Sequence, residues 1–196
     1  MSQPAERLVL ATDVSNYQPA DLSDLVAQYP DVRHICVRLS TETNRNQRAI
    51  AVAQLRWATA HGYETSGYIW AYWGLNPRDH ISDALSVAAE AGVDLAFAAI
   101  DVEDSDVASP EACIPWLRTA IEELVLAGVE PIIYSAPDFW QTYLNDTTEF
   151  SDIGLWGAQP DGIATLESLV TYGGMRAVGK QYVMSPIDLD VFALPA

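Results

Sequence analysis

Short apolar stretches alternate with longer amphipathic stretches along most of this chain. The apolar stretches have the length of buried strands, and we expect strands at residues 8–12, 35–39, 67–71, 95–100 and 131–134. The longer stretches carry apolar residues at helical spacing, and we expect helices at residues 21–28, 47–60, 79–91 and 109–127. Glycine follows three of these helices, at Gly62, Gly92 and Gly128. This recurrence of helix, glycine and strand predicts an α/β domain.

The pattern changes towards the end of the chain. We expect strands at residues 153–156, 179–184 and 190–192, with no long helix between them. A regular barrel of eight strand–helix units does not fit this pattern, whereas a barrel with a degenerate second half does. The 196 residues suit one core, so we expect a single domain over residues 1–196.

Two carboxylates stand where the fourth expected strand ends. Residues 95–100 are apolar or small, and Asp101 and Glu103 follow them. Side chains alternate along a strand, so residues two apart point the same way and lie about 6–7 Å apart. Placing like charges together costs free energy, and folding alone does not require it. Cleavage of a glycosidic bond does require two carboxyls, one as an acid and one to stabilise positive charge.

Acids and tyrosines also stand in or beside the ends of the other expected strands. They are Asp13, Glu42, Tyr68, Tyr72, Tyr134, Asp188 and Asp190. In barrel folds the active site lies at the carboxyl ends of the strands, so these residues are candidates for one site. The alternative for each of them is that loops simply begin with polar residues.

The formal net charge of −17 argues against binding to nucleic acid or to anionic membranes. We expect the chain to act as a monomer. The cysteines, Cys36 and Cys113, show no spacing typical of a disulfide framework or a metal site, and we expect buried free thiols. The first residues, MSQPAERLVLATD, do not resemble a signal peptide, and no apolar stretch is long enough to span a bilayer. We therefore expect a soluble protein that is made in the cytoplasm.

Short motifs follow one another along nearly the whole chain: DVSNYQ (13–18), RLSTE (38–42), GYIW (67–70), IDVE (100–103), PIIYS (131–135) with FW (139–140), LW (155–156), QY (181–182) and DLDVF (188–192). In order and spacing they resemble the motifs of the glycoside hydrolase family 25 lysozymes: DVS-x-YQ, K-A-S/T-E-G, G-x-Y-H-F, D-x-E, PIIYT with FW, LW-x-A, QY and D-L-D/N-x-F. Three positions depart from the family pattern: Thr43 replaces Gly, Ile69 replaces His and Lys180 replaces Trp.

The resemblance implies an irregular (β/α) TIM-like barrel that hydrolyses the β-1,4 bond between N-acetylmuramic acid and N-acetylglucosamine in peptidoglycan. Glu103 is then the general acid, because burial beside Asp101 would raise its pKa. Asp101 stabilises the oxocarbenium or oxazolinium centre or attacks directly, and its spacing from Glu103 does not decide between these roles. The family implies net retention, with the substrate's own N-acetyl group as a candidate nucleophile.

The remaining site residues follow from the same resemblance. Asp13 and Asp188 complete the set of catalytic acids, Asp190 is the weaker candidate, and Glu42 braces the site. Tyr68 and Tyr134 position the sugar through their hydroxyls, and further aromatic residues stack on it. These are Trp70, Tyr72, Trp156 and Tyr182. For each of these aromatic residues, packing in the core is the alternative.

Other chemistries fit the sequence poorly. His34, His61 and His80 lie far apart without metal-ligand spacing, and Ser135 lacks the glycines of a nucleophile elbow. We therefore expect neither a metal nor a cofactor. The partner is bacterial cell-wall peptidoglycan, reached through phage lysis or a non-classical route of release. Two alternatives stay open: a wall-binding protein without turnover, and a hydrolase of another N-acetylhexosamine polymer such as chitin.

Overall fold

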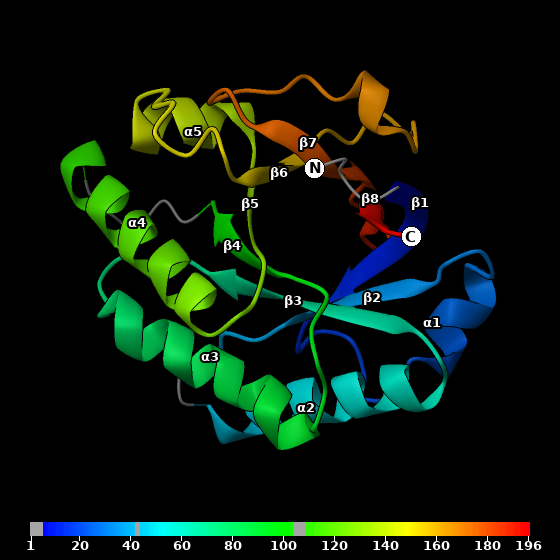
Figure 1. Cartoon of the computed structure of the whole chain (residues 1–196). Coiled ribbons are helices and arrows are strands. Elements are labelled where there is room, and N and C mark those ends of the chain that lie inside the picture. The colour runs from blue at the N-terminus through cyan, green and yellow to red at the C-terminus, as the bar shows by residue number, and fades with distance from the viewer. Residues whose placement is uncertain (1–5, 42–43, 104–108) are drawn as a thin grey trace.

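Eight strands close into a barrel in a computed structural model, which describes residues 6–41, 44–103 and 109–196 (Figure 1). The strands follow one another around the barrel in chain order. They are β1 (Glu6–Val14), β2 (His34–Arg38), β3 (Glu64–Trp70), β4 (Ala98–Val102), β5 (Pro131–Ser135), β6 (Gly154–Ala158), β7 (Arg176–Val183) and β8 (Leu189–Pro195). Strands β1 to β7 pair in parallel, and β8 closes the barrel antiparallel to β7 and β1.

Helices cover the outside of the barrel only along its first part. They are α1 (Ser23–Gln28), α2 (Arg45–Ala60), α3 (Pro77–Ala91), α4 (Pro110–Leu126) and α5 (Pro137–Leu144), and they follow β1 to β5 in turn. Between β6 and β7 the described residues form only a 3-10 turn, η1 (Leu166–Ser168). The predicted barrel with a degenerate second half is therefore confirmed. None of the helices in the described ranges is long and apolar enough to cross a membrane.

The alternation of side chains along the strands divides the core into two layers. Inward-facing side chains fill the barrel itself, among them Cys36, Phe97, Tyr134, Trp156 and Phe192. Outward-facing side chains of the same strands pack beneath the helices, with Ile35, Val37, Ile69, Ile100 and Ile133 as examples.

His34 and the two cysteines belong to these layers. His34 is fully buried, stacks on Phe97 and shares a hydrogen bond of 2.6 Å with Ser66. Burial lowers the pKa of His34 to about 3, so its ring stays neutral inside the barrel. Cys36 and Cys113 are buried thiols that are not joined in a disulfide, as predicted.

A buried lysine holds the connection that replaces the missing helix. Lys180 is the one lysine of the chain, and its side chain is completely buried on the outer side of β7. Its ammonium donates to Asp161 at 2.7 Å, to the carbonyl of Ile163 at 2.9 Å and to the hydroxyl of Ser168 at 2.6 Å. Three acceptors satisfy the three donors of a lysine, which offsets the cost of burying its charge.

The element boundaries differ most at the fourth strand. The sequence predicts a strand at residues 95–100, whereas β4 spans Ala98–Val102 and so contains Asp101. β4 begins at Ala98 because this is its first residue that pairs with the neighbouring strands, opposite Gly67 on β3 and Pro131 on β5. An apolar run in the sequence does not show where such pairing starts. Helix α5, which carries the FW pair, was not predicted.

The inside of the barrel leaves no room for a side chain at one glycine of β7. A Cβ atom at Gly179 would lie 2.5 Å from the ring of Phe192, which is buried beside Trp156. We expect Gly179→Ala to lower the free energy of unfolding by about 1–3 kcal/mol in urea denaturation, because the closely packed ring of Phe192 has no free space into which to move. The control is Gly74→Ala, where a Cβ meets nothing within 4 Å. Equal stability of the two variants would contradict this packing.

Candidate active site

Five acids meet at one rim of the barrel. The carboxyl ends of β1 to β7 lie at this rim because these strands are parallel, and β8 begins there because it runs the other way. These acids are Asp13, Asp101, Glu103, Asp188 and Asp190, which we call the acid cluster. The structure thus brings the four predicted catalytic acids together with Asp190, the weaker candidate from sequence.

Asp101 lies within the last residues of β4, and Glu103 follows the strand directly. Asp101 pairs across the sheet with Trp70 on β3 and with Tyr134 on β5. Its side chain is buried, and its charge raises the pKa of Tyr134. Glu103 follows β4 and is partly exposed, so it is open to an incoming molecule.

A chain of hydrogen bonds leads from Tyr134 to Asp13. The hydroxyl of Tyr134 donates to Oε1 of Gln181 at 2.8 Å. The amide nitrogen of the same Gln181 side chain then donates to Oδ2 of Asp13 at 3.0 Å. Because an amide has one donating and one accepting end, these two bonds fix the orientation of Gln181.

The pKa is raised for four acids of this cluster: Asp13, Glu103, Asp188 and Asp190. Burial, reinforced by the charge of Asp188, raises the pKa of Asp13 to about 8, while the hydrogen bond from Gln181 opposes this rise. Burial and the charge of Asp188 likewise raise the pKa of Glu103. Burial raises the pKa of Asp188 itself. Carboxyls that keep a proton near neutral pH are able to act as general acids.

Arg38 supplies a positive charge beside the acid cluster. It stands at the end of β2, its guanidinium lies 5.5 Å from the centre of the Trp70 ring, and it donates to the Tyr72 hydroxyl at 2.6 Å. Its charge lowers the pKa of Glu103 and so opposes the effects of burial and of Asp188. Arg38 was not among the site residues predicted from sequence.

The predicted sugar-binding aromatic residues divide by burial. Trp156 and Tyr134 are almost fully buried inside the barrel, and the indole of Trp156 donates to Oδ1 of Asp190 at 3.0 Å. This burial favours the core role that the sequence left open for Trp156. The others are partly exposed: Tyr68, Trp70, Tyr72 and Tyr182. Burial raises the pKa of Tyr68, with the charges of Asp13 and Asp101 adding to the effect, which places this tyrosine beside both acids.

Two residues of the site were missed from sequence, Arg38 and Gln181, and Asp190 was only the weaker candidate there. Each stands in a strand two or four positions from a residue that also faces the barrel interior, such as Cys36, Gly179 or Phe192. The sequence signal for these residues is therefore a polar side chain at a strand position whose neighbours two residues away face the barrel interior. Glu42, predicted to brace the site, lies outside the described residues.

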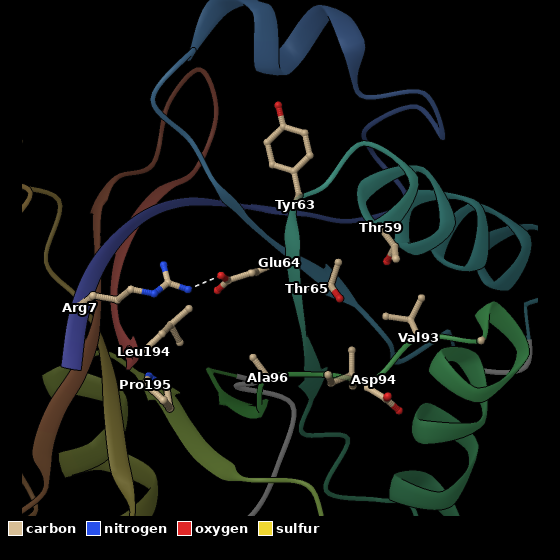
Figure 2. A pocket seen from close by; sticks show the side chains of 12 residues that line it. Arg7, Thr59, Tyr63, Glu64, Thr65, Val93, Asp94, Ala96, Leu194 and Pro195 are labelled. Carbon is tan, nitrogen blue, oxygen red and sulfur yellow. Dashed lines mark hydrogen bonds and ion pairs between the residues drawn. The ribbon is translucent and has the colours of Figure 1, made fainter. Parts of the chain in front are cut away.

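A hollow of about 660 Å³ lies at the opposite end of the barrel. Figure 2 shows Arg7 and Glu64 joined by an ion pair at one side of it, with Asp94 and Val93 at another. None of the predicted site residues lies among the described residues that line this hollow.

The sequence profile of glycosyl hydrolases family 25 matches residues 12–164. The chain belongs to glycosyl hydrolase family 25. Because it belongs to this family, the protein is a glycoside hydrolase. Its closed barrel agrees with this assignment. No curated protein matches the sequence.

Solved structures share the fold of this family 25 chain at low identity. A muramidase from Trichobolus zukalii is 17% identical over 94% of this chain and 93% of its own, with a TM-score of 0.74. A lysozyme from Streptomyces coelicolor is 13% identical over 94% and 91%, with a TM-score of 0.70. The autolysin LytC from Streptococcus pneumoniae, in complex with a synthetic peptidoglycan ligand, is 15% identical over 95% of this chain and 46% of its own, with a TM-score of 0.73.

The raised pKa of Asp13 predicts how stability depends on pH in this family 25 protein. The group binds its proton more tightly when folded, so its contribution is fully favourable below pH 4 and is lost as the pH rises through about 8. We expect Asp13→Asn to reduce the loss of unfolding free energy between pH 5 and pH 9 by a few kcal/mol, since one pKa unit corresponds to about 1.4 kcal/mol. Urea denaturation at both pH values measures this difference. A pH dependence identical to that of the unchanged protein would show that Asp13 titrates normally.

Proposed function

We propose that this family 25 protein is a muramidase that hydrolyses the β-1,4 bond between N-acetylmuramic acid and N-acetylglucosamine in bacterial peptidoglycan. The observation that carries the proposal is Glu103, a partly exposed carboxyl with a raised pKa, two residues from the buried Asp101. Such a pair suits glycosidic cleavage. The fold shared with two lysozyme-type enzymes and with an autolysin bound to a peptidoglycan ligand supports the choice of substrate.

Glu103 acts as the general acid in this proposal. Burial and the negative charge of Asp188 keep its proton in place, while Arg38 limits how far its pKa rises. A pKa above that of an ordinary glutamate leaves more of the acid form available near neutral pH, and this form protonates the leaving oxygen. A hydrogen bond between the side chains of Tyr134 and Glu103 also opposes the rise in the pKa of Glu103.

Asp101 stabilises the positive charge that develops at the sugar carbon. It faces the barrel interior beside Tyr68 and Tyr134, where water is excluded and a fixed charge acts strongly. The N-acetyl oxygen of the substrate attacks the anomeric carbon as the glycosidic bond breaks, and an oxazolinium ring forms. Water then opens this ring and gives a proton back to Glu103, so the product retains its anomeric configuration. NMR analysis of the first product formed distinguishes this course from inversion.

The remaining residues bind and orient the sugar chain. Asp13 is proposed to contact the N-acetyl group, while Asp188 supplies the charge that raises the pKa of Glu103. The partly exposed aromatic rings are the candidates for stacking on sugars, and Arg38 holds two of them, Trp70 and Tyr72, in place. Trp156 supports the site from inside the barrel.

The catalytic assignment is tested by exchanging carboxyls for amides of the same shape. We expect Glu103→Gln to lower turnover by about 10²–10⁴-fold, because the proton donor is lost. We expect Asp101→Asn to lower it by about 10²–10³-fold, because a charge that stabilises the transition state is lost. Clearing of turbid cell-wall suspensions measures turnover, and near-ultraviolet circular dichroism checks that each variant is folded.

The matched control is Glu122→Gln on the exposed face of α4, which should clear walls at the unchanged rate. If the unchanged protein clears no wall type faster than Glu103→Gln while both sediment with walls, the protein binds glycan without turnover. Release of new reducing ends from chitin, but not from walls, would point to the other N-acetylhexosamine polymer.

The high negative charge predicts how the enzyme responds to salt. Cell walls that carry anionic polymers repel a protein of charge −17, and salt screens this repulsion over about 10 Å at 0.1 M. We expect the initial clearing rate to rise when sodium chloride is increased from 10 to 150 mM. A rate that falls over this range would show that attraction between charges, rather than repulsion, governs the approach.

A further inference from the structure

Asp190 is a completely buried acid in an otherwise apolar strand. It faces the barrel interior, where it lies opposite Ala11 on β1 and opposite Gln181 on β7. Asp13 stands two residues beyond Ala11 on the same face of β1, so the two carboxyls are diagonal neighbours across the strand pair. A hydrogen bond joins the side chains of Asp13 and Asp190.

The donors around this pair of carboxyls decide where its proton lies. Oδ1 of Asp190 accepts from the indole of Trp156 at 3.0 Å, while no described group donates to the buried Oδ2 atom. Asp13 already accepts from Gln181. A hydrogen bond between two carboxyls needs a proton on one of them, and a proton on Asp190 leaves Asp13 as the acceptor of both bonds.

The surroundings of Asp190 favour its neutral form. Burial raises its pKa, with the charges of Asp13 and Asp188 adding to the effect. The other titratable groups that its charge reaches come from three further strands and are Cys36 on β2, Tyr134 on β5 and Tyr182 on β7. None of these five groups carries a positive charge.

We propose that Asp190 is a positioning residue whose protonated carboxyl, held by Trp156, donates a hydrogen bond to Asp13 and aims it at the substrate. Its effect on turnover rests on the proposed function, whereas its protonation does not. The protonated carboxyl of Asp190 has one accepting and one donating oxygen, so it can form the same two hydrogen bonds as an amide. Gln181 holds Asp13 from β7 in the same manner, so Asp13 is fixed from two strands.

Two substitutions of nearly the same shape test this role. Asp190→Asn keeps an acceptor for Trp156 and a donor for Asp13, whereas Asp190→Leu keeps only the volume. We expect the asparagine variant to retain a substantial part of wall-clearing turnover at pH 6. We expect the leucine variant to lose on the order of 10- to 100-fold while remaining folded, because Asp13 loses its donor. Equal turnover of the two variants would overturn the proposal, since it would leave Asp190 with a packing role alone.

A second measurement does not depend on activity or on the leucine variant folding. The unfolding free energy of the unchanged protein should fall as the pH rises from 7 to 10, because the pair must then give up its shared proton inside the barrel. Asp190→Asn should reduce this fall, and Asp152→Asn, an exposed control, should not. An unchanged fall in Asp190→Asn would overturn the proposal. An unchanged protein that clears no walls but passes this stability test would refute the proposed function and leave the protonation of Asp190 standing.

Discussion

This structure must hold several carboxyls close together in surroundings that largely exclude water. Five acids converge at the end of the barrel, and burial is the first cause of the raised pKa values of Asp13, Glu103 and Asp190. Leaving these groups ionised side by side would cost several kcal/mol. The barrel tolerates them because some keep their protons and because Gln181, Trp156 and Arg38 provide donors or opposite charge. The same features that cost stability make an acid available for glycosidic cleavage.

The direction of the last strand makes this convergence possible. If β8 ran parallel to its neighbours, its first residues would lie at the opposite end of the barrel from Asp13. Because β8 is antiparallel, Asp188 and Asp190 enter at the rim where β1 and β7 end. The hydroxyl of Thr12 reinforces this closure by donating to the carbonyl of Asp188 at 2.7 Å. The degenerate second half of the barrel therefore contributes two of the five acids.

Much of this arrangement was predictable from sequence, and the failures have identifiable causes. Helices and parallel strands of the first half leave strong periodic signals, and the apolar run before Asp101 and Glu103 shows that both stand where a buried strand ends. The start of β4 was wrong because strand pairing, rather than apolar character, sets it. Gln181 was missed, and Asp190 was ranked below the other acids, because hydrogen bonds between β7, β8 and β1 join residues far apart in the sequence. The burial of Lys180 was not predictable because its acceptors lie in the connection between β6 and β7, which has no regular periodicity.

We infer that the barrel holds one proton on Glu103 and another on the hydrogen-bonded pair of Asp13 and Asp190 at pH values where ordinary carboxyls are charged. Carbon-13 NMR of side-chain carboxyls, followed from pH 3 to pH 10 and assigned with Glu103→Gln and Asp13→Asn, measures this directly. The account predicts that the Asp13 signal titrates near pH 8 and that the Glu103 signal titrates above the usual range of glutamate. Titration of both signals near pH 4, as in unstructured peptides, would contradict it.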